Sequence, residues 1–310
     1  HMLEKVIFII GEKILQEHIL CGESLLLENL REHGVKIALR DYGETGICHG
    51  GGISQSADYK SRDSEETGEK DKGITATAAA NILYITDSED VFCMLAHQGK
   101  YILPYRHDGN ADAFFAGAPY VIEQIEEVDF QTVDMAYRRM AGLPWEILTT
   151  QRCVIRETTV QDVDGFYRIY SDSAITEYME DLYEDRDEET AYIKEYQEKV
   201  YGFYGYGMWT VLLKDGTVIG RAGISWREGF DLPELGFVIG VPWQRNGYAY
   251  EVCSAILFYG REELGITQVQ ALVMEENEKS AALCRKLGFE QDGCVVLDDR
   301  EYIVYKYSAG

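Results

Sequence analysis

The sequence predicts an α/β protein built from two domains, and three observations carry this prediction. The chain has 310 residues, whereas a single domain usually holds roughly 100–200. Hydrophobic residues make up 46% of the chain, which is enough for a buried core in each half. Short runs rich in Ile and Val alternate with segments of helical periodicity, as in domains whose helices cover a sheet.

The first half begins with a strand, a helix and a second strand. Residues 6–10 and 35–39 are unbroken apolar runs, which are typical of strands buried in a parallel sheet. Between them, three leucines on one helical face precede a glycine that is suited to cap the helix (Leu25, Leu26, Leu30 and Gly34). This order predicts a Rossmann-like domain, which we place at residues 3–148.

The periodic pattern stops near residue 42 and returns near residue 81. Residues 42–73 are rich in Gly, Ser and charged side chains, so we expect a long mobile loop there. The elements expected after it are a strand at 81–86, a helix near 89–98, strands at 101–103 and 120–122, and a helix near 130–140. We place the domain boundary at 148–151.

The second half, residues 151–308, opens with an expected strand at 153–156. Helices near 160–171 and 188–201 follow, and then three strands in series at 208–213, 218–226 and 235–239. Asp215-Gly216 predicts a hairpin turn between the first two strands of that series. The last expected elements are a helix with Val252, Ile256 and Tyr259 on one face, a strand at 268–273, a helix at 280–287, and strands at 293–297 and 301–307.

Charge and cysteine usage exclude several classes of protein. The chain has 29 basic and 54 acidic residues, so its surface repels phosphate backbones, and we expect no nucleic-acid partner. The same charge favours cationic partners such as amines, although solubility alone would also explain the excess of acidic residues.

No apolar run approaches the roughly 18 residues of a membrane span. Seven scattered cysteines without a C-x-x-C pair fit reduced thiols in a cytoplasmic protein and no metal site.

The segment between the strand at 235–239 and the next helix is suited to bind an anion. It reads Gln244, Arg245, Asn246, Gly247, Tyr248 and Ala249. The start of a helix leaves backbone N–H groups unpaired and favours negative charge, and glycine allows close approach of a ligand. A diphosphate suits such a turn. An ordinary structural turn explains the same six residues equally well.

The order of these elements adds context to the turn. A three-strand meander, the turn, an amphipathic helix, a strand and a helix containing Asn277-Glu-Lys-Ser280 and Lys286-Leu-Gly-Phe289 follow one another. From residue 153 to residue 307 this arrangement resembles the GNAT acyltransferases, and most closely the ribosomal-protein N-terminal acetyltransferase subgroup. The resemblance implies an α/β domain with a mixed, splayed sheet and acetyl-CoA as cofactor.

The resemblance also implies how the cofactor is bound. Residues 244–249 would hold its diphosphate. The backbone of Phe237, Val238 and Ile239 would splay from the neighbouring strand and pair with the pantetheine arm, and an N–H near Val238 would stabilise the oxyanion. Asn277 would bond the cofactor, although a plain helix cap is the alternative.

The acid and the base are expected among residues other than histidine, because all six histidines precede residue 108. The family often places a glutamate where Glu234 stands, which makes it the candidate base; a solvated strand end is the alternative. Many relatives have a tyrosine at the position of Cys284, so this chain departs from that pattern. The similar subgroup places a serine at Ser280. Ser280 and Cys284 are therefore candidate acids, although both could be ordinary packing residues.

The acceptor is expected to contact residues 178–209, where acidic and aromatic side chains mix and would attract a cationic amine. The predicted function is acetyl-CoA-dependent N-acetyltransfer to a primary amine of a small molecule or a protein N-terminus, by direct attack. The alternative is a non-catalytic module that binds or senses acyl-CoA and carries a pseudo-phosphatase scaffold. The acceptor's identity and the oligomeric state stay open.

The first half resembles the haloacid dehalogenase-like (HAD) phosphohydrolases, in an uncapped and degenerate form. That family needs an aspartate nucleophile at the end of its first strand and a second aspartate two residues later. Ile9 and Gly11 stand there instead and support neither phosphoryl attack nor Mg²⁺ binding. Asp87, Glu89 and Asp90 follow the third strand, where we expect solvated acids or at most a weak metal site.

Overall fold

The computed structural model describes residues 3–20, 25–40, 42, 81–179 and 181–309. The chain forms two compact units, His1–Ala141 and Gly142–Gly310. The division falls several residues before the expected boundary at 148–151, because Glu146–Thr149 is a strand of the second unit's sheet. The expected loop at 42–73 lies outside the described residues, apart from Tyr42. Within the described residues, no helix is both long and apolar enough to cross a bilayer.

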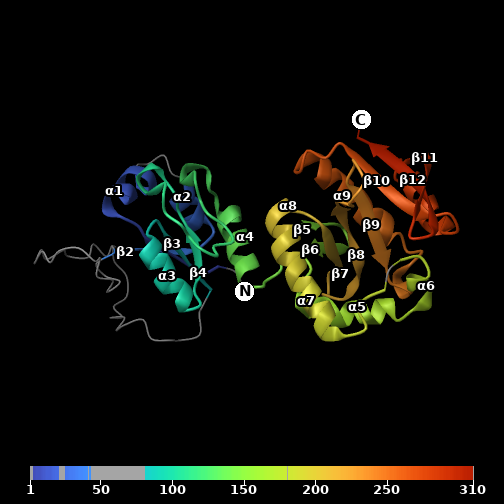
Figure 1. The fold of residues 1–310 in the computed structure, drawn as a ribbon, viewed down its shortest axis with the longest axis horizontal. Coiled ribbons are helices and arrows are strands. Elements are labelled where there is room, and N and C mark those ends of the chain that lie inside the picture. The colour runs from blue at the N-terminus through green and yellow to red at the C-terminus, as the bar shows by residue number, and fades with distance from the viewer. Residues whose placement is uncertain (1–2, 21–24, 41, 43–80, 180, 310) are drawn as a thin grey trace, which may run out of the picture. The chain divides into compact units, whose positions relative to one another are not determined.

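The first unit contains a parallel four-stranded sheet (Figure 1) in the order β2-β1-β3-β4. Its strands are β1 (Lys5–Ile9), β2 (Lys36–Arg40), β3 (Ile82–Thr86) and β4 (Tyr101–Pro104). Its α-helices are α1 (Glu12–Ile14), α2 (Leu25–Glu32), α3 (Glu89–His97) and α4 (Phe130–Met140). The strand expected at 120–122 does not form and is reduced to an isolated bridge between Tyr105 and Ile122.

The acids after β3 have structural partners. Asp87 is 7% exposed; its carboxylate accepts hydrogen bonds from the Gly11 N–H at 3.3 Å and from the Tyr42 hydroxyl, and it pairs with His107 at 3.3 Å. The Glu89 carboxylate accepts from the Phe114 N–H at 3.3 Å. Asp87 is therefore not the solvated acid expected, because the ends of β1 and β4 enclose it. Across the described residues, no group of three His, Cys, Asp or Glu side chains is arranged to hold a metal ion.

The second unit contains a mixed eight-stranded sheet in the order β11-β12-β10-β9-β8-β7-β6-β5. Its strands are β5 (Glu146–Thr149), β6 (Cys153–Arg156), β7 (Met208–Leu213), β8 (Val218–Ser225), β9 (Glu234–Ile239), β10 (Gln268–Met274), β11 (Glu290–Leu297) and β12 (Arg300–Ser308). Its α-helices are α5 (Val163–Tyr170), α6 (Ser173–Thr176), α7 (Arg186–Tyr196), α8 (Gly202–Tyr204), α9 (Tyr248–Glu262) and α10 (Glu278–Lys286). The helix expected to end at 201 continues after α7 as a π-helical turn, Gln197–Tyr201.

The two faces of this sheet have separate hydrophobic clusters. On one face, Val252 and Ile256 of α9 pack with Trp209 of β7. On the other face, Phe166 of α5 packs with Val238 of β9 and with Ile193 of α7. Side chains alternate between the faces along each strand, so residues 208, 210, 221 and 238 lie on the face of α5 and α7. This alternation decides which side chains reach the site described below.

Parallel pairing is confined to the centre of this sheet, between β9 and β10. These strands share a single registered pair, Gln270 with Glu234, whereas β8 and β9 share six. Beyond that pair β9 and β10 diverge. The sheet is therefore mixed and splayed, as the sequence predicts, and the splay opens toward the carboxyl ends of both strands.

Candidate active site

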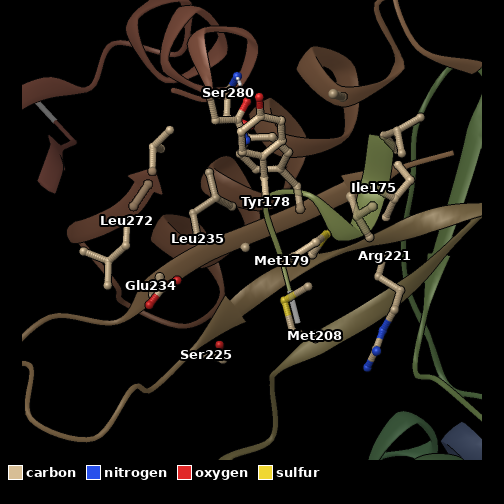
Figure 2. A pocket seen from close by; sticks show the side chains of 18 of the residues that line it. Ile175, Tyr178, Met179, Met208, Arg221, Ser225, Glu234, Leu235, Leu272 and Ser280 are labelled. Carbon is tan, nitrogen blue, oxygen red and sulfur yellow. Dashed lines mark hydrogen bonds between the residues drawn. The ribbon is translucent and has the colours of Figure 1, made fainter. Parts of the chain in front are cut away.

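A cavity of about 1240 Å³ lies where β9 and β10 diverge. One side is lined by the whole of β9 and by residues 271–274 of β10. The turn before α9, the start of α10 and side chains between residues 170 and 208 complete the walls. Figure 2 shows Glu234, Leu235 and Leu272 at the strands, and Tyr178 and Ser280 among the other side chains that line the cavity. The candidate cofactor residues, with the exception of Asn246, therefore share one cavity with acceptor candidates.

The backbone of β9 presents alternate residues to this cavity. In an antiparallel ladder, every second residue directs its N–H and C=O toward the neighbouring strand. The Gly240 N–H donates to the Ile219 carbonyl at 2.8 Å, and this bond sets the alternation along β8 and β9. Val238 therefore directs its backbone toward β8, whereas Phe237 and Ile239 direct theirs toward the splay. Of the N–H groups near Val238, those of Phe237 and Ile239 thus face the cavity, whereas that of Val238 itself points toward β8.

The turn at 244–247 has the backbone geometry of an anion-binding turn. Arg245 and Gly247 both have left-handed backbones, with φ of 60° and 81°. The Gln244 side chain donates to the Ile239 carbonyl at 2.9 Å and so fixes the turn to the end of β9. Gly247 is the N-cap of α9, and no side chain caps that helix. The first N–H groups of α9 are therefore available to a ligand, beside the exposed Arg245.

A polar network outside the predicted residues supports this turn. Glu251 accepts hydrogen bonds from the Thr150 hydroxyl at 2.7 Å, the Arg152 N–H at 2.8 Å and the Arg152 Nε at 2.6 Å. Arg152 also donates through Nη1 to the Asn246 carbonyl at 3.0 Å, and its guanidinium lies 4.2 Å from the Tyr248 ring centroid. Burial would raise the pKa of Glu251, but the hydrogen bonds from Thr150 and Arg152 lower it below its ordinary value.

The candidates on α10 differ in their access to the cavity. Asn277 caps the helix, since its side chain accepts from the Ser280 N–H at 3.1 Å, and both residues line the cavity. Cys284 lies in the core on the α9 face, is 0% exposed and does not line the cavity. Burial raises the pKa of its thiol to about 12. The geometry therefore keeps Ser280 as a candidate acid and removes Cys284.

Glu234 lies at the closed end of the splay. It is the residue of β9 that pairs with β10, and its side chain is 12% exposed. Arg227 contacts both of its carboxylate oxygens, through Nε at 2.5 Å and through Nη2 at 3.3 Å. Each oxygen keeps a second lone pair that can accept a proton from an amine or a bridging water. A solvated strand end does not describe this buried, ion-paired carboxylate.

The acceptor side of the cavity is rich in aromatic side chains. Within the expected stretch 178–209, Trp209 is fully buried on the opposite face and takes no part. Tyrosines and Met208 line the cavity instead, together with Trp226, whose indole N–H donates to the Tyr206 hydroxyl at 2.5 Å. Partial burial, followed by the charge of Glu177, raises the pKa of Tyr178. Tyr178 therefore keeps its hydroxyl proton, and it lines the same cavity as Ser280.

Comparison with known proteins decides the family. The Acetyltransferase (GNAT) domain family matches residues 152–290. The chain is 30% identical over 155 residues to the uncharacterized N-acetyltransferase YoaA of Bacillus subtilis, a match that covers 47% of this chain and 84% of that protein. The chain belongs to the GNAT acetyltransferase family.

Two further proteins similar to this chain are named as acetyltransferases of ribosomal proteins. The [ribosomal protein uS5]-alanine N-acetyltransferase of Escherichia coli is 28% identical over 165 residues, which are 49% of this chain and 82% of that protein. A ribosomal L7/L12 alpha-N-protein acetyltransferase, solved in complex with coenzyme A, is 13% identical with a TM-score of 0.46; the match covers 53% of this chain and 98% of that one.

These findings confirm that the chain is a GNAT enzyme with acetyl-CoA as its cofactor. They also favour the enzyme over the non-catalytic module, because the relatives are N-acetyltransferases. The family match begins at residue 152 and leaves the first unit uncovered. The HAD-like resemblance of that unit has no support here and stays a prediction.

Proposed function

We propose that this GNAT enzyme acetylates a primary amine by direct attack of the amine on the thioester of acetyl-CoA. The observation that carries the proposal is the cavity in the splay of β9 and β10, which joins an anion-binding turn to a buried carboxylate. Acetyl-CoA supplies the activated acetyl group. The turn at 244–249 and the start of α9 bind its diphosphate, while the backbone of Phe237 and Ile239 pairs with its pantetheine arm.

Glu234 is the proposed base. The attacking amine must lose a proton, and a carboxylate serves either directly or through one water. Arg227 holds both carboxylate oxygens and so keeps the carboxylate oriented at the closed end of the splay. The Phe237 N–H faces the same splay, and we assign it to the oxyanion that forms at the thioester carbon.

Ser280 is the proposed acid that returns a proton to the departing thiolate. Its N–H is fixed by the Asn277 side chain at the start of α10, which holds the serine at the cavity wall. Tyr178 lines the same cavity and carries a hydroxyl of raised pKa, so it is the second candidate for this proton. A double variant, Ser280→Ala with Tyr178→Phe, tests whether the two hydroxyls substitute for each other.

Thiol release from acetyl-CoA over a panel of primary amines tests the function. The panel includes small diamines, amino acids and peptides with free N-termini. Turnover that requires an amine and that falls in Glu234→Gln supports the proposal. Tight binding of acetyl-CoA without turnover on any amine would restore the non-catalytic alternative.

For the first unit we propose a HAD-like Rossmann domain without phosphatase chemistry. The parallel order β2-β1-β3-β4 supports it, as do Ile9 and Gly11 at the positions where that family has its aspartates. Mg²⁺-dependent hydrolysis of a phosphoester by the full chain, lost in Asp87→Ala, would refute this proposal.

A further inference from the structure

Arg221 is a partly buried arginine that lines the acceptor part of the cavity. It lies on β8 directly opposite Val238 of β9 and Thr210 of β7. Its side chain leaves the strand on the face of α5 and α7 and lines the same cavity as Glu234 (Figure 2). Cross-strand neighbours have Cβ atoms about 4.5–5.5 Å apart. The Arg221 side chain therefore starts next to Val238, and Val238 follows Phe237, the proposed oxyanion donor.

No carboxylate neutralises this guanidinium in the described part of the chain. The Arg221 Nε is buried and has no hydrogen-bond partner, and no acidic oxygen lies within 4.0 Å of the guanidinium. The Phe166 ring lies 4.8 Å from it. The Tyr170 hydroxyl contacts the guanidinium, but burial raises the pKa of Tyr170 and Tyr196, so these phenols stay neutral and supply no counter-charge.

Two acids, Asp181 and Glu189, line this part of the cavity, and Glu189 of α7 is the buried one. It accepts one hydrogen bond, from the Tyr183 N–H at 3.3 Å, and its second oxygen is buried without a donor. The two opposite charges therefore stand apart within one cavity. Each keeps a polar atom free for a ligand.

A guanidinium with limited access to water and no carboxylate partner is costly, because arginine cannot shed its proton. An anion bound in the cavity would offset that cost. The planar fork of N–H donors matches a carboxylate, which can accept two parallel hydrogen bonds. In a chain with a net charge of −25, a cation held in the acceptor cavity is a feature that general solubility does not explain.

We propose that Arg221 binds a carboxylate of the acceptor, so that the substrate is an amine that also carries a carboxylate. This inference rests on the proposed function and narrows the acceptor class. It departs from the purely cationic amine that the acidic composition suggests. Arg221 is paired with Val238, which is adjacent to the proposed oxyanion donor Phe237. The carboxylate of the acceptor should therefore be only a few bonds from its reacting nitrogen. Amino acids and peptides with an acidic N-terminal residue meet this condition.

Matched pairs of amines test this specificity in the full chain at saturating acetyl-CoA. Each pair differs only in the carboxylate: an amino acid with its amide, and an N-terminal aspartyl peptide with its asparaginyl counterpart. We expect kcat/KM to favour the carboxylate member by about tenfold or more. Arg221→Gln should bring this ratio to about one by lowering the value for the carboxylate member. Arg221→Lys should keep part of the preference, since it keeps the charge but loses the fork.

Glu189→Gln is the matched control, because it removes a buried charge of opposite sign from the same cavity. It should keep the preference for the carboxylate member. A wild-type ratio of one or less, or a ratio that persists in Arg221→Gln, would overturn the inference. Turnover on neutral amines with no carboxylate preference would leave the proposed function standing and remove only this inference.

A binding measurement covers variants or amines that give no turnover. In wild-type protein saturated with coenzyme A, the carboxylate member of each pair should raise the thermal midpoint more than its amide does. Arg221→Gln should lose this difference while still binding coenzyme A, which also shows that the variant is folded. Equal shifts for acid and amide in the wild-type protein would refute carboxylate binding directly.

Discussion

Removing the guanidinium of Arg152 should weaken the binding of acetyl-CoA without changing the chemical step. Arg152 donates to the Asn246 carbonyl at 3.0 Å and covers Tyr248, the first residue of α9. Arg152→Gln loses both contacts. Glu251 keeps its hydrogen bonds from Thr150 and from the backbone of residue 152, so the turn loosens and the fold is preserved.

The size of the effect follows from this geometry. A hydrogen bond to a charged group contributes about 1.5–3 kcal/mol. The Arg152 side chain is 39% exposed, so solvent screening reduces the contribution of its hydrogen bond to the Asn246 carbonyl. The Kd of acetyl-CoA should therefore rise by about 5- to 30-fold when this bond is lost.

Titration calorimetry with acetyl-CoA measures this Kd. Arg261→Gln is the matched control, since Arg261 lies near the other end of α9, is also 39% exposed and is also ion-paired, with Glu262 at 2.6 Å. The control should bind with wild-type affinity, and kcat at saturating acetyl-CoA should be unchanged in both variants. Wild-type affinity in Arg152→Gln, or an equal loss in Arg261→Gln, would refute the role of the network.

Four further predictions concern the same site. The pKa of Glu251 is lowered in the folded protein. The ionised Glu251 therefore supports the turn fully above the ordinary carboxyl pKa, and this support is lost as the pH falls through the pKa of the folded state. The affinity for acetyl-CoA should drop on acidification, and it should drop less in Glu251→Gln. Glu234→Gln should lower kcat by about 100- to 10,000-fold with an unchanged Kd for acetyl-CoA, and unchanged turnover would transfer the role of base elsewhere. Gly247→Glu should abolish acetyl-CoA binding, because its φ is 81° and a carboxylate there repels the diphosphate; retained affinity in a direct titration would count against the turn. Cys284→Ala should keep kcat within about twofold while lowering the thermal midpoint, and a large loss of kcat in a folded variant would return the thiol to the mechanism.

Features that depend on neighbouring residues were predictable from the sequence. The meander strands follow from their apolar patterns, and the Asp215-Gly216 hairpin follows from a glycine that adopts φ of 88°. Gly247 and Asn277 occupy the helix starts that their residue types favour. Each of these rests on interactions spanning only a few residues, which a single sequence records.

Features that depend on distant residues were not predictable. Arg152 and Glu251 are 99 residues apart in sequence, and nothing near either residue indicates the other. The N–H that faces the splay is that of Phe237 and not of Val238, because the register with β8 decides it. Apolar patterns also do not predict which charged side chains line a cavity. The position of the Arg221 guanidinium in the acceptor cavity could therefore be recognised only from the fold.

The central claim is that the turn before α9 and the splayed edge of β9 together hold acetyl-CoA. A crystal structure of the complex with acetyl-CoA or coenzyme A measures this directly. We expect diphosphate oxygens within hydrogen-bonding distance of the N–H groups of residues 245–249, and the acyl or thiol end of the cofactor beside Phe237 and Glu234. A cofactor bound elsewhere, with the start of α9 unliganded and β9 paired along its length to β10, would contradict the account.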